Sequence, residues 1–346
     1  MQPRIFFQEV QEAHASAVER VGSTEFCLDV AGRRIRISFA SDVLSDRLMP
    51  ALMHRVCQPD AKQDSFNILV WDTASTGIQP PLPPWGPDDY LARGEVRGFD
   101  ADGIRTAYHI GANVLSLFNE STATAIFWTP DGATLPEYQV GSPFLIILHW
   151  WAEAQNLMIV HSGAVGRADG GVLLAGAGGS GKSTTALACA GSLGMRYVSD
   201  DYCLLETSDG DRAHSVFSSG KLDANSLNLL PRFEPWVSNS DPGGSEKAII
   251  FLSKWIPEEL ADSLPIRAIL LPNTSESDAT RIRPASPAEA LRALAPSTIF
   301  QLTGAGNRTF VQLGALVRRV PSFHLDLSRD MSDTPAAILS LLEQVA

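Results

Sequence analysis

The sequence predicts two domains, a strand-rich α+β domain followed by an α/β domain. Three observations support this prediction. The chain has 346 residues, enough for two domains that each bury a core. Short alternating segments fill its first part, whereas strands alternate with helices in the second. Between them, "TPDGATLPEYQVGSP" is rich in turn-forming residues. We therefore expect domains over residues 1–135 and 136–346.

The first domain is expected to be rich in strands with one helix, and its last four strands are expected to form an antiparallel meander. Ser41 is expected to cap that helix, "SDVLSDRLMPALMHRVC", and Pro50 to bend it. Alternation of apolar and polar residues predicts the strands. They are "FCLDV", "RIRISFA", "NILVW", "GEVRGF", "IRTAYHI", "ANVLSLF" and "TATAIFW". No cluster of chemically active side chains occurs in this part of the sequence, so its role stays open.

The second domain is expected to begin with a helix from Ser142-Pro143 to about Asn156. The strands "LMIVHSGAV" and "VLLAG" follow, then the helix "TTALACAGSL" and the strand "MRYVSDDYCLLE", which two acids interrupt. Farther on, Ser286 and Glu289 predict a capping box at the start of "SPAEALRALA". Strands and helices alternate to the end of the chain. This order is typical of an α/β domain.

Composition argues against several classes of partner. The net charge is −12, from 27 basic and 39 acidic side chains, and an acidic surface repels nucleic acid and anionic membranes. We therefore expect no nucleic-acid and no membrane partner. The densest apolar run, "FLIILHWWA", is far shorter than the roughly 20 residues that span a bilayer. The four cysteines are widely spaced and form no C-x-x-C motif, which favours a reduced, cytoplasmic setting.

Residues 176–183, "GAGGSGKS", match the phosphate-loop pattern G-x-x-x-x-G-K-[ST] in full. Glycines allow successive N–H groups to point at phosphate oxygens, and the following helix adds its positive end. Lys182 is expected to neutralise the β- and γ-phosphates of ATP, and Ser183 to bind Mg²⁺. The alternative is a glycine-rich turn that binds nothing. The predicted nucleotide-binding residues are Gly176, Gly178, Gly179, Ser180, Gly181, Lys182, Ser183 and Thr184.

A histidine lies upstream of this loop, in "HSGAV". If Val165 pairs with Val172 in an antiparallel hairpin, the same register places His161 opposite Gly176. The imidazole would then lie beside the phosphate site. The alternative is a histidine that is hydrogen-bonded inside a strand. An adjacent antiparallel strand before the loop would also differ from Ras-like and RecA-like proteins.

Two acids follow the strand after the loop. An acid in this position is typical of a carboxylate that holds Mg²⁺ directly or through water. Asp200 and Asp201 are neighbours in an extended segment, so they are expected to face opposite sides and to divide two tasks. One could accept a proton from an attacking hydroxyl, and the other could hold metal. The alternative is a solvated pair that opens a turn.

The combination of His161, the loop at 176–183 and Asp200-Asp201 resembles HPr kinase/phosphorylase, a family with a fold related to phosphoenolpyruvate carboxykinase. The close match covers about 45 residues. The segments "SSGKL", "SPAEALRAL" and "FQLTGAG" are similar to divergent relatives of that family, some of which phosphorylate peptide precursors. The resemblance implies a serine kinase that uses ATP and Mg²⁺ and acts on a protein or peptide. It also suggests a homo-oligomer.

Residue by residue, the resemblance implies that Asp200 is the general base and that Asp201 assists with Mg²⁺. Lys182 and Ser183 would hold ATP and metal, and His161 would contact phosphate. Lys221 and Lys247 are weaker candidates for stabilising the transferring phosphoryl group. Arg318 and Arg319 are expected to complement a helix dipole.

Two other functions stay open at this stage. The same scaffold could phosphorylate a small molecule. Alternatively, the protein could bind ATP in order to set the state of a partner, without any transfer.

Overall fold

The computed structural model describes residues 2–59, 65–208, 210–239, 247–275 and 277–345. The chain divides into two compact units, a mixed α/β arrangement with several sheets. The N-terminal unit comprises residues 1–155 together with 301–304, and the C-terminal unit comprises 156–300 and 305–346. The division after Gln155 falls later than the break expected after residue 135. No helix among the described residues is long and apolar enough to cross a membrane.

In the N-terminal unit, the described residues form a six-stranded sheet of order β1-β2-β3-β6-β5-β4. β6, β5 and β4 form the expected antiparallel meander. β3, for which no pairing was predicted, is parallel to both β2 and β6. Expected strand "GEVRGF" contributes only isolated bridges. The strands are β1 (Thr24–Val30), β2 (Arg33–Phe39), β3 (Ser65–Asp72), β4 (Ile104–His109), β5 (Val114–Asn119) and β6 (Thr124–Thr129).

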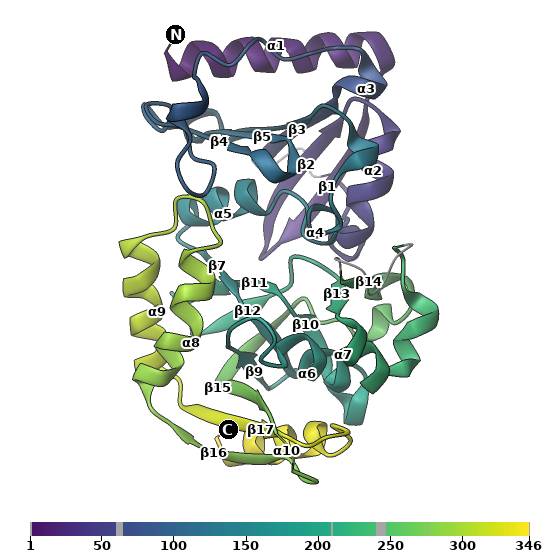
Figure 1. Cartoon of the computed structure of the whole chain (residues 1–346), viewed down its shortest axis with the longest axis vertical. Helices are drawn as coiled ribbons and strands as arrows, with labels where there is room; N and C mark the ends of the chain where they lie inside the picture. Colours follow the sequence, from purple (N-terminus) through teal and green to yellow (C-terminus); the bar gives the residue numbers. More distant parts are fainter. Residues whose placement is uncertain (1, 60–64, 209, 240–246, 276, 346) are drawn as a thin grey trace. The chain divides into compact units, whose positions relative to one another are not determined.

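Helices cover both faces of this sheet (Figure 1). On one face, α1 (Pro3–Val21) packs Phe6, Phe7 and Val10 against a core that includes Trp71 and Leu117. On the other face, α5 (Leu145–Ala154) stacks Trp151 on Phe66 of β3, with ring centroids 6.0 Å apart. This contact explains why α5 belongs to the N-terminal unit rather than to the second expected domain.

Two helices of this unit differ from their predicted limits. α5 begins at Leu145 because Phe144 before it has a left-handed backbone, with φ 59°, so Pro143 is not its first residue. Phe144 is buried against Phe127. α2 (Asp42–Leu48) ends two residues before Pro50, where the sequence predicted a bend. Two short 3₁₀ turns follow it, Met49–Ala51 and Met53–Arg55. Ser41 makes no side-chain cap.

In the C-terminal unit, the main sheet has the order β10-β8-β9-β15-β12-β11-β7 within the described part of the chain, with β17 beside β15 and β16 beside β17. The long strand β15 runs parallel to β9 and β17. The strands are β7 (Met158–His161), β8 (Gly163–Arg167), β9 (Gly170–Leu174), β10 (Arg196–Ser199), β11 (Tyr202–Glu206), β12 (Arg212–His214), β13 (Ser219–Leu222), β14 (Ala248–Phe251), β15 (Ser263–Thr274), β16 (Arg281–Ala285) and β17 (Ser322–Leu327).

Alternate residues of these strands supply two cores. Leu174 and Leu270 pack on the side of α6 (Lys182–Cys189) and α10 (Thr334–Gln344). Leu173 and Ile269 pack on the side of α8 (Pro287–Ile299) and α9 (Asn307–Arg319), which lie side by side in Figure 1. The predicted capping box of Ser286 and Glu289 starts α8. A separate antiparallel pair of strands, β13 with β14, lies against α6, and α7 (Ala224–Leu229) follows β13.

Candidate functional site

The phosphate-loop sequence connects β9 to α6, the strand-to-helix context that the motif requires. Gly179 and Gly181 have φ of 79° and 99°, which other residues rarely adopt. A Cβ at Gly181 would lie 2.7 Å from Cδ1 of Leu327, and one at Gly176 would lie 2.4 Å from Oγ of Ser180. Glycine is therefore needed at these positions for this course of the backbone.

Lys182 begins α6 and is 6% exposed. Its Nζ donates to the carbonyl oxygens of Gly176 at 2.8 Å and Ala177 at 3.1 Å, so the ammonium lies over the backbone of the loop. Burial lowers the pKa of Lys182, the carboxylate of Asp201 opposes this, and the ammonium of Lys247 adds to it. The charges of Asp201 and Lys247 are therefore close enough to act on Lys182.

The loop offers donors that a phosphate would satisfy. The Ser180 hydroxyl is buried and has no hydrogen-bond partner among the described residues. Gly178 and Gly179 are exposed, with open space where a Cβ would lie. Such an arrangement fits an anion with several acceptor oxygens. Ser183 is half-buried in the first turn of α6. Thr184 instead donates its hydroxyl to Ser226 of α7, at 2.8 Å.

The β8–β9 hairpin has the predicted register, with Val165 opposite Val172. The extension of this register to His161 is wrong. The ladder stops at Gly163, and the Ser162 hydroxyl donates to the carbonyl of Leu174 at 2.6 Å. His161 belongs to β7, where it pairs with Tyr202 of β11 instead of Gly176. The chain thus passes from one strand ladder to another at Ser162.

Asp201 is the centre of a charged cluster. Its Oδ1 lies 2.8 Å from Nε2 of His161, and its Oδ2 lies 2.7 Å from Nζ of Lys221. Burial acts against ionisation here, but Lys221 and His161 outweigh it and hold the pKa of Asp201 far below its usual range. The side chain of Asp201 is 22% exposed. Asp201 is therefore an ionised carboxylate that a ligand can reach.

Asp200 has different surroundings, although it lies in the same bend between β10 and β11. It is 1% exposed, and it accepts from the backbone N–H of Lys221 at 2.9 Å. The hydroxyl of Tyr197 lies 2.9 Å from Asp200 and 2.7 Å from the carbonyl oxygen of Ser219. A phenol has one proton and cannot donate to both. Burial, followed by the charge of Asp201, raises the pKa of Asp200, and a protonated Asp200 could donate to Tyr197 and satisfy every group.

The two acids thus lie in a bend, not in a strand, and their carboxylates contact different groups. The task assigned to Asp200, that of general base, conflicts with its burial, because both its oxygens already contact groups of the protein. The more exposed carboxylate is Asp201.

Lys221 completes the cluster from β13. It is 8% exposed, and its backbone and side chain contact Asp200 and Asp201 respectively. A Cβ at Gly220 would lie 2.8 Å from Cδ2 of Leu187 in α6, so a glycine allows β13 to approach the phosphate-loop helix. The sequence indicated Lys221 only as one of two candidate lysines. The need for glycine at position 220 was not predicted. The one signal for it in the sequence was its position beside a lysine in "SSGKL".

Comparisons with known proteins give a distant similarity only. No family model matches the chain, and no curated protein matches its sequence. Among solved structures, the Hpr(Ser) kinase/phosphatase from Coxiella burnetii is similar at 10% sequence identity. That similarity covers 54% of this chain and 97% of the other, with a TM-score of 0.31. A TM-score this low does not show a shared fold. Evidence for the function therefore comes from the geometry of the phosphate loop and the Asp201 cluster.

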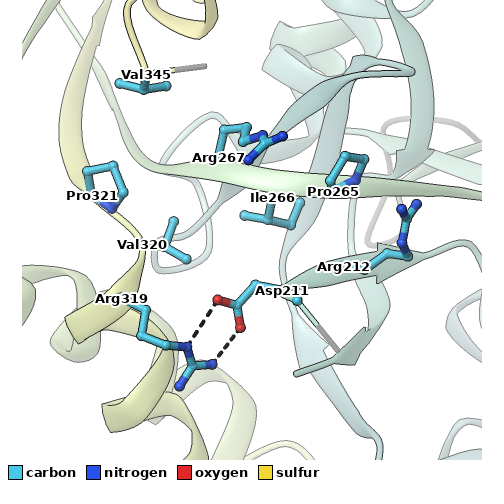
Figure 2. Close-up of a pocket in the computed structure, with 10 residues that line it drawn as sticks. Asp211, Arg212, Pro265, Ile266, Arg267, Arg319, Val320, Pro321 and Val345 are labelled. Atoms are coloured by element: carbon cyan, nitrogen blue, oxygen red, sulfur yellow. Dashed lines mark hydrogen bonds and ion pairs between the residues drawn. The ribbon is translucent and has the colours of Figure 1, made fainter. Parts of the chain in front are cut away.

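A cavity of about 340 Å³ lies at the other end of the parallel strands (Figure 2). It is lined by Asp211, by the start of β15 and by the segment between α9 and β17. Arg319 makes two hydrogen bonds to the carboxylate of Asp211, at 2.5 and 3.2 Å. The prediction that Arg319 complements a helix dipole therefore omitted its main contact. None of the predicted site residues lines this cavity.

Proposed function

We propose that this protein is an ATP-dependent phosphotransferase that moves the γ-phosphoryl group to a serine of a protein or peptide. The observation that carries the proposal is the position of Asp201, which contacts both His161 and Lys221 beside a complete phosphate loop. Binding a nucleotide requires the loop and a metal ligand. The buried histidine and lysine add groups that orient an acceptor and balance developing charge, which are requirements of transfer.

The roles follow from exposure and charge. Lys182 and the N–H groups of residues 176–181 would hold the phosphates of ATP, and Ser183 would hold Mg²⁺. Mg²⁺ supplies charge neutralisation when bound and takes its other ligands from phosphates and water. We assign Asp201 to the acceptor hydroxyl, since its side chain is 22% exposed. Asp200 is then a positioning residue that holds Lys221 and Tyr197 in place.

The alternative role of Asp201, as a Mg²⁺ ligand, can be separated by experiment. If Asp201 holds metal, Asp201→Asn should raise the Mg²⁺ concentration that gives half-maximal rate. If Asp201 orients the acceptor, the same change should lower kcat at saturating Mg²⁺ and leave that concentration unchanged.

Transfer is tested by incubating the full chain with γ-labelled ATP, Mg²⁺ and a library of serine-containing peptides. We expect label on serine, and no label when serine is replaced by alanine or when the enzyme carries Asp201→Asn. The proposed acceptor is a modified-peptide precursor or a small carrier protein. Since the proposal does not specify its charge, the peptides should include acidic and basic sequences.

Two outcomes would redirect the assignment. Turnover on small hydroxyl-bearing metabolites but on no peptide would make the protein a small-molecule kinase. Tight ATP binding without transfer to either class, together with ATP-dependent capture of a partner, would make it a nucleotide-dependent interaction module.

A further inference from the structure

Two cysteines that lie far apart in the sequence meet in the N-terminal unit. Cys27 is in β1 and Cys57 follows the second 3₁₀ turn, and their Sγ atoms are 3.6 Å apart. Leu28 and Val56 form an antiparallel bridge, and the N–H of Cys57 donates to the carbonyl oxygen of Cys27 at 2.8 Å. The two cysteines are therefore directly opposite each other.

Their backbone positions suit a disulfide. Directly opposite residues in antiparallel pairs have Cα atoms about 4.5–5.5 Å apart. Disulfides span Cα separations of about 4.4–6.8 Å. Closing the bond therefore needs rotation of the two side chains and little movement of the backbone. Both cysteines are free thiols and are half-buried.

A guanidinium contacts one of the two thiols directly. Nη1 of Arg34 lies 3.0 Å from Sγ of Cys57 and 2.7 Å from Oδ2 of Asp29, so the carboxylate holds the guanidinium beside the sulfur. Positive charge stabilises a thiolate. Burial, followed by the neighbouring sulfur, raises the pKa of Cys27 and outweighs the opposing charges of Arg34 and Arg36. Cys57 is therefore the thiol that is equipped to attack an oxidant, and Cys27 is placed to react second.

We propose that Cys27 and Cys57 form a reversible disulfide in the presence of a hydroperoxide. The Cys57 thiolate attacks one oxygen of the peroxide and the O–O bond breaks, so its sulfur is oxidised to sulfenic acid. The other oxygen leaves as hydroxide, which takes up the proton lost by the Cys57 thiol and becomes water. Sγ of Cys27 then attacks the oxidised sulfur, the S–S bond forms, and the sulfenic oxygen leaves as water with the proton of Cys27. In total, two thiols and one hydrogen peroxide give one disulfide and two waters. This inference is independent of the proposed kinase activity.

The bond would join β1 to the segment after the second 3₁₀ turn and close a loop that contains β2 and α2. Cross-linking such a loop restricts the unfolded chain and stabilises the folded one. Oxidation should therefore raise the Tm of the full chain, and reduction should restore the original value.

The test is to treat the native full chain with stoichiometric hydrogen peroxide and to measure its intact mass without reductant. We expect a loss of two hydrogens per chain that dithiothreitol reverses, and peptide mapping should find the link between Cys27 and Cys57.

Cys27→Ser should instead accumulate a sulfenic acid on Cys57 that dimedone traps. Arg34→Met should slow formation of the link in the otherwise unchanged chain. The remaining cysteines, Cys189 and Cys203, are fully buried and serve as internal controls that should stay unmodified.

Several results would overturn the proposal. One is a wild-type chain in which Cys57 accumulates sulfenic acid but never links to Cys27. Another is a chain in which native Cys27 and Cys57 are both alkylated by iodoacetamide yet are inert to peroxide. A link that forms equally fast with Arg34→Met would remove the role assigned to the guanidinium.

Discussion

Nε2 of His161 lies 2.8 Å from Oδ1 of Asp201, which joins the end of β7 to the bend before β11. An ionised carboxylate only accepts hydrogen bonds, so Nε2 carries the proton in this contact. The pairing of His161 with Tyr202 places the imidazole here.

Asp201→Asn should lower kcat by about 10²–10⁴-fold, the usual contribution of a positioned acid or base, with little change in ATP affinity. Single-turnover transfer and equilibrium binding of ATP measure the two quantities separately. Asp88→Asn changes an exposed acid in the N-terminal unit and is the matched control. An unchanged rate in Asp201→Asn would remove Asp201 from the proposed chemistry.

Asp200→Asn should fold normally, whereas Asp200→Ala should lose roughly 1–3 kcal/mol of stability because it leaves buried donors unpaired. An asparagine can accept from the N–H of Lys221 and donate to the hydroxyl oxygen of Tyr197. The pKa of Asp200 is raised in the folded state, so its contribution is present at low pH and is lost as pH rises through the folded pKa. The Tm of Asp200→Asn should therefore gain on wild type as pH rises. A constant difference across the pH range would contradict a raised pKa.

Lys182→Met should weaken ATP binding by roughly 10–100-fold, since a hydrogen bond to a charged group contributes about 1.5–3 kcal/mol. Methionine preserves the aliphatic volume of this buried side chain. Lys254→Met is the control, because Lys254 is exposed and lies over the ring of Trp255. Isothermal titration with ATP, with and without Mg²⁺, gives both affinities. Equal affinities for wild type and Lys182→Met would indicate that the loop does not bind phosphate.

Gly220→Ala should reduce turnover by displacing Lys221 from Asp201. The new Cβ would lie 2.8 Å from Cδ2 of Leu187, so β13 or α6 must shift. Gly86→Ala adds the same methyl group where nothing lies within 4 Å and φ is negative, and it should leave the rate unchanged. The measurement is kcat at saturating ATP alongside the Tm of each variant. A rate loss in both variants would mean that the effect is not specific to β13.

The stability of the N-terminal unit should fall as pH decreases below about 6.5, the ordinary pKa of histidine. Burial lowers the pKa of His14 and of His149 to about 4, so the unfolded chain binds more protons between these values. The contribution of these two histidines to the free energy of unfolding is therefore complete above about pH 6.5. It is lost as pH falls towards about 4, by about 3 kcal/mol for each histidine. His14→Leu and His149→Leu should each flatten the dependence of Tm on pH. If the variants show the same slope of Tm against pH as wild type, these histidines do not cause the loss of stability.

Local patterns predicted much of the fold. The phosphate loop, the β8–β9 register and the capping box of Ser286 with Glu289 all depend on residues close together in the sequence. The first helix, α1, was not predicted, although its buried residues Phe6, Val10 and Ala17 recur at helical spacing. The parallel position of β3 was also missed, since alternation predicts a strand but not its neighbours.

The sequence by itself determined the chemistry that the chain carries, namely a glycine-rich cradle with a lysine, a pair of acids, and an upstream histidine. Only the tertiary structure decided which of these groups touch. It placed His161 beside Asp201 rather than Gly176, assigned Lys221 to the same carboxylate, and brought Cys27 to Cys57. The physical reason is that spacing within one strand or turn follows from backbone geometry, whereas contacts between distant strands follow from how the whole sheet pairs and which faces are buried.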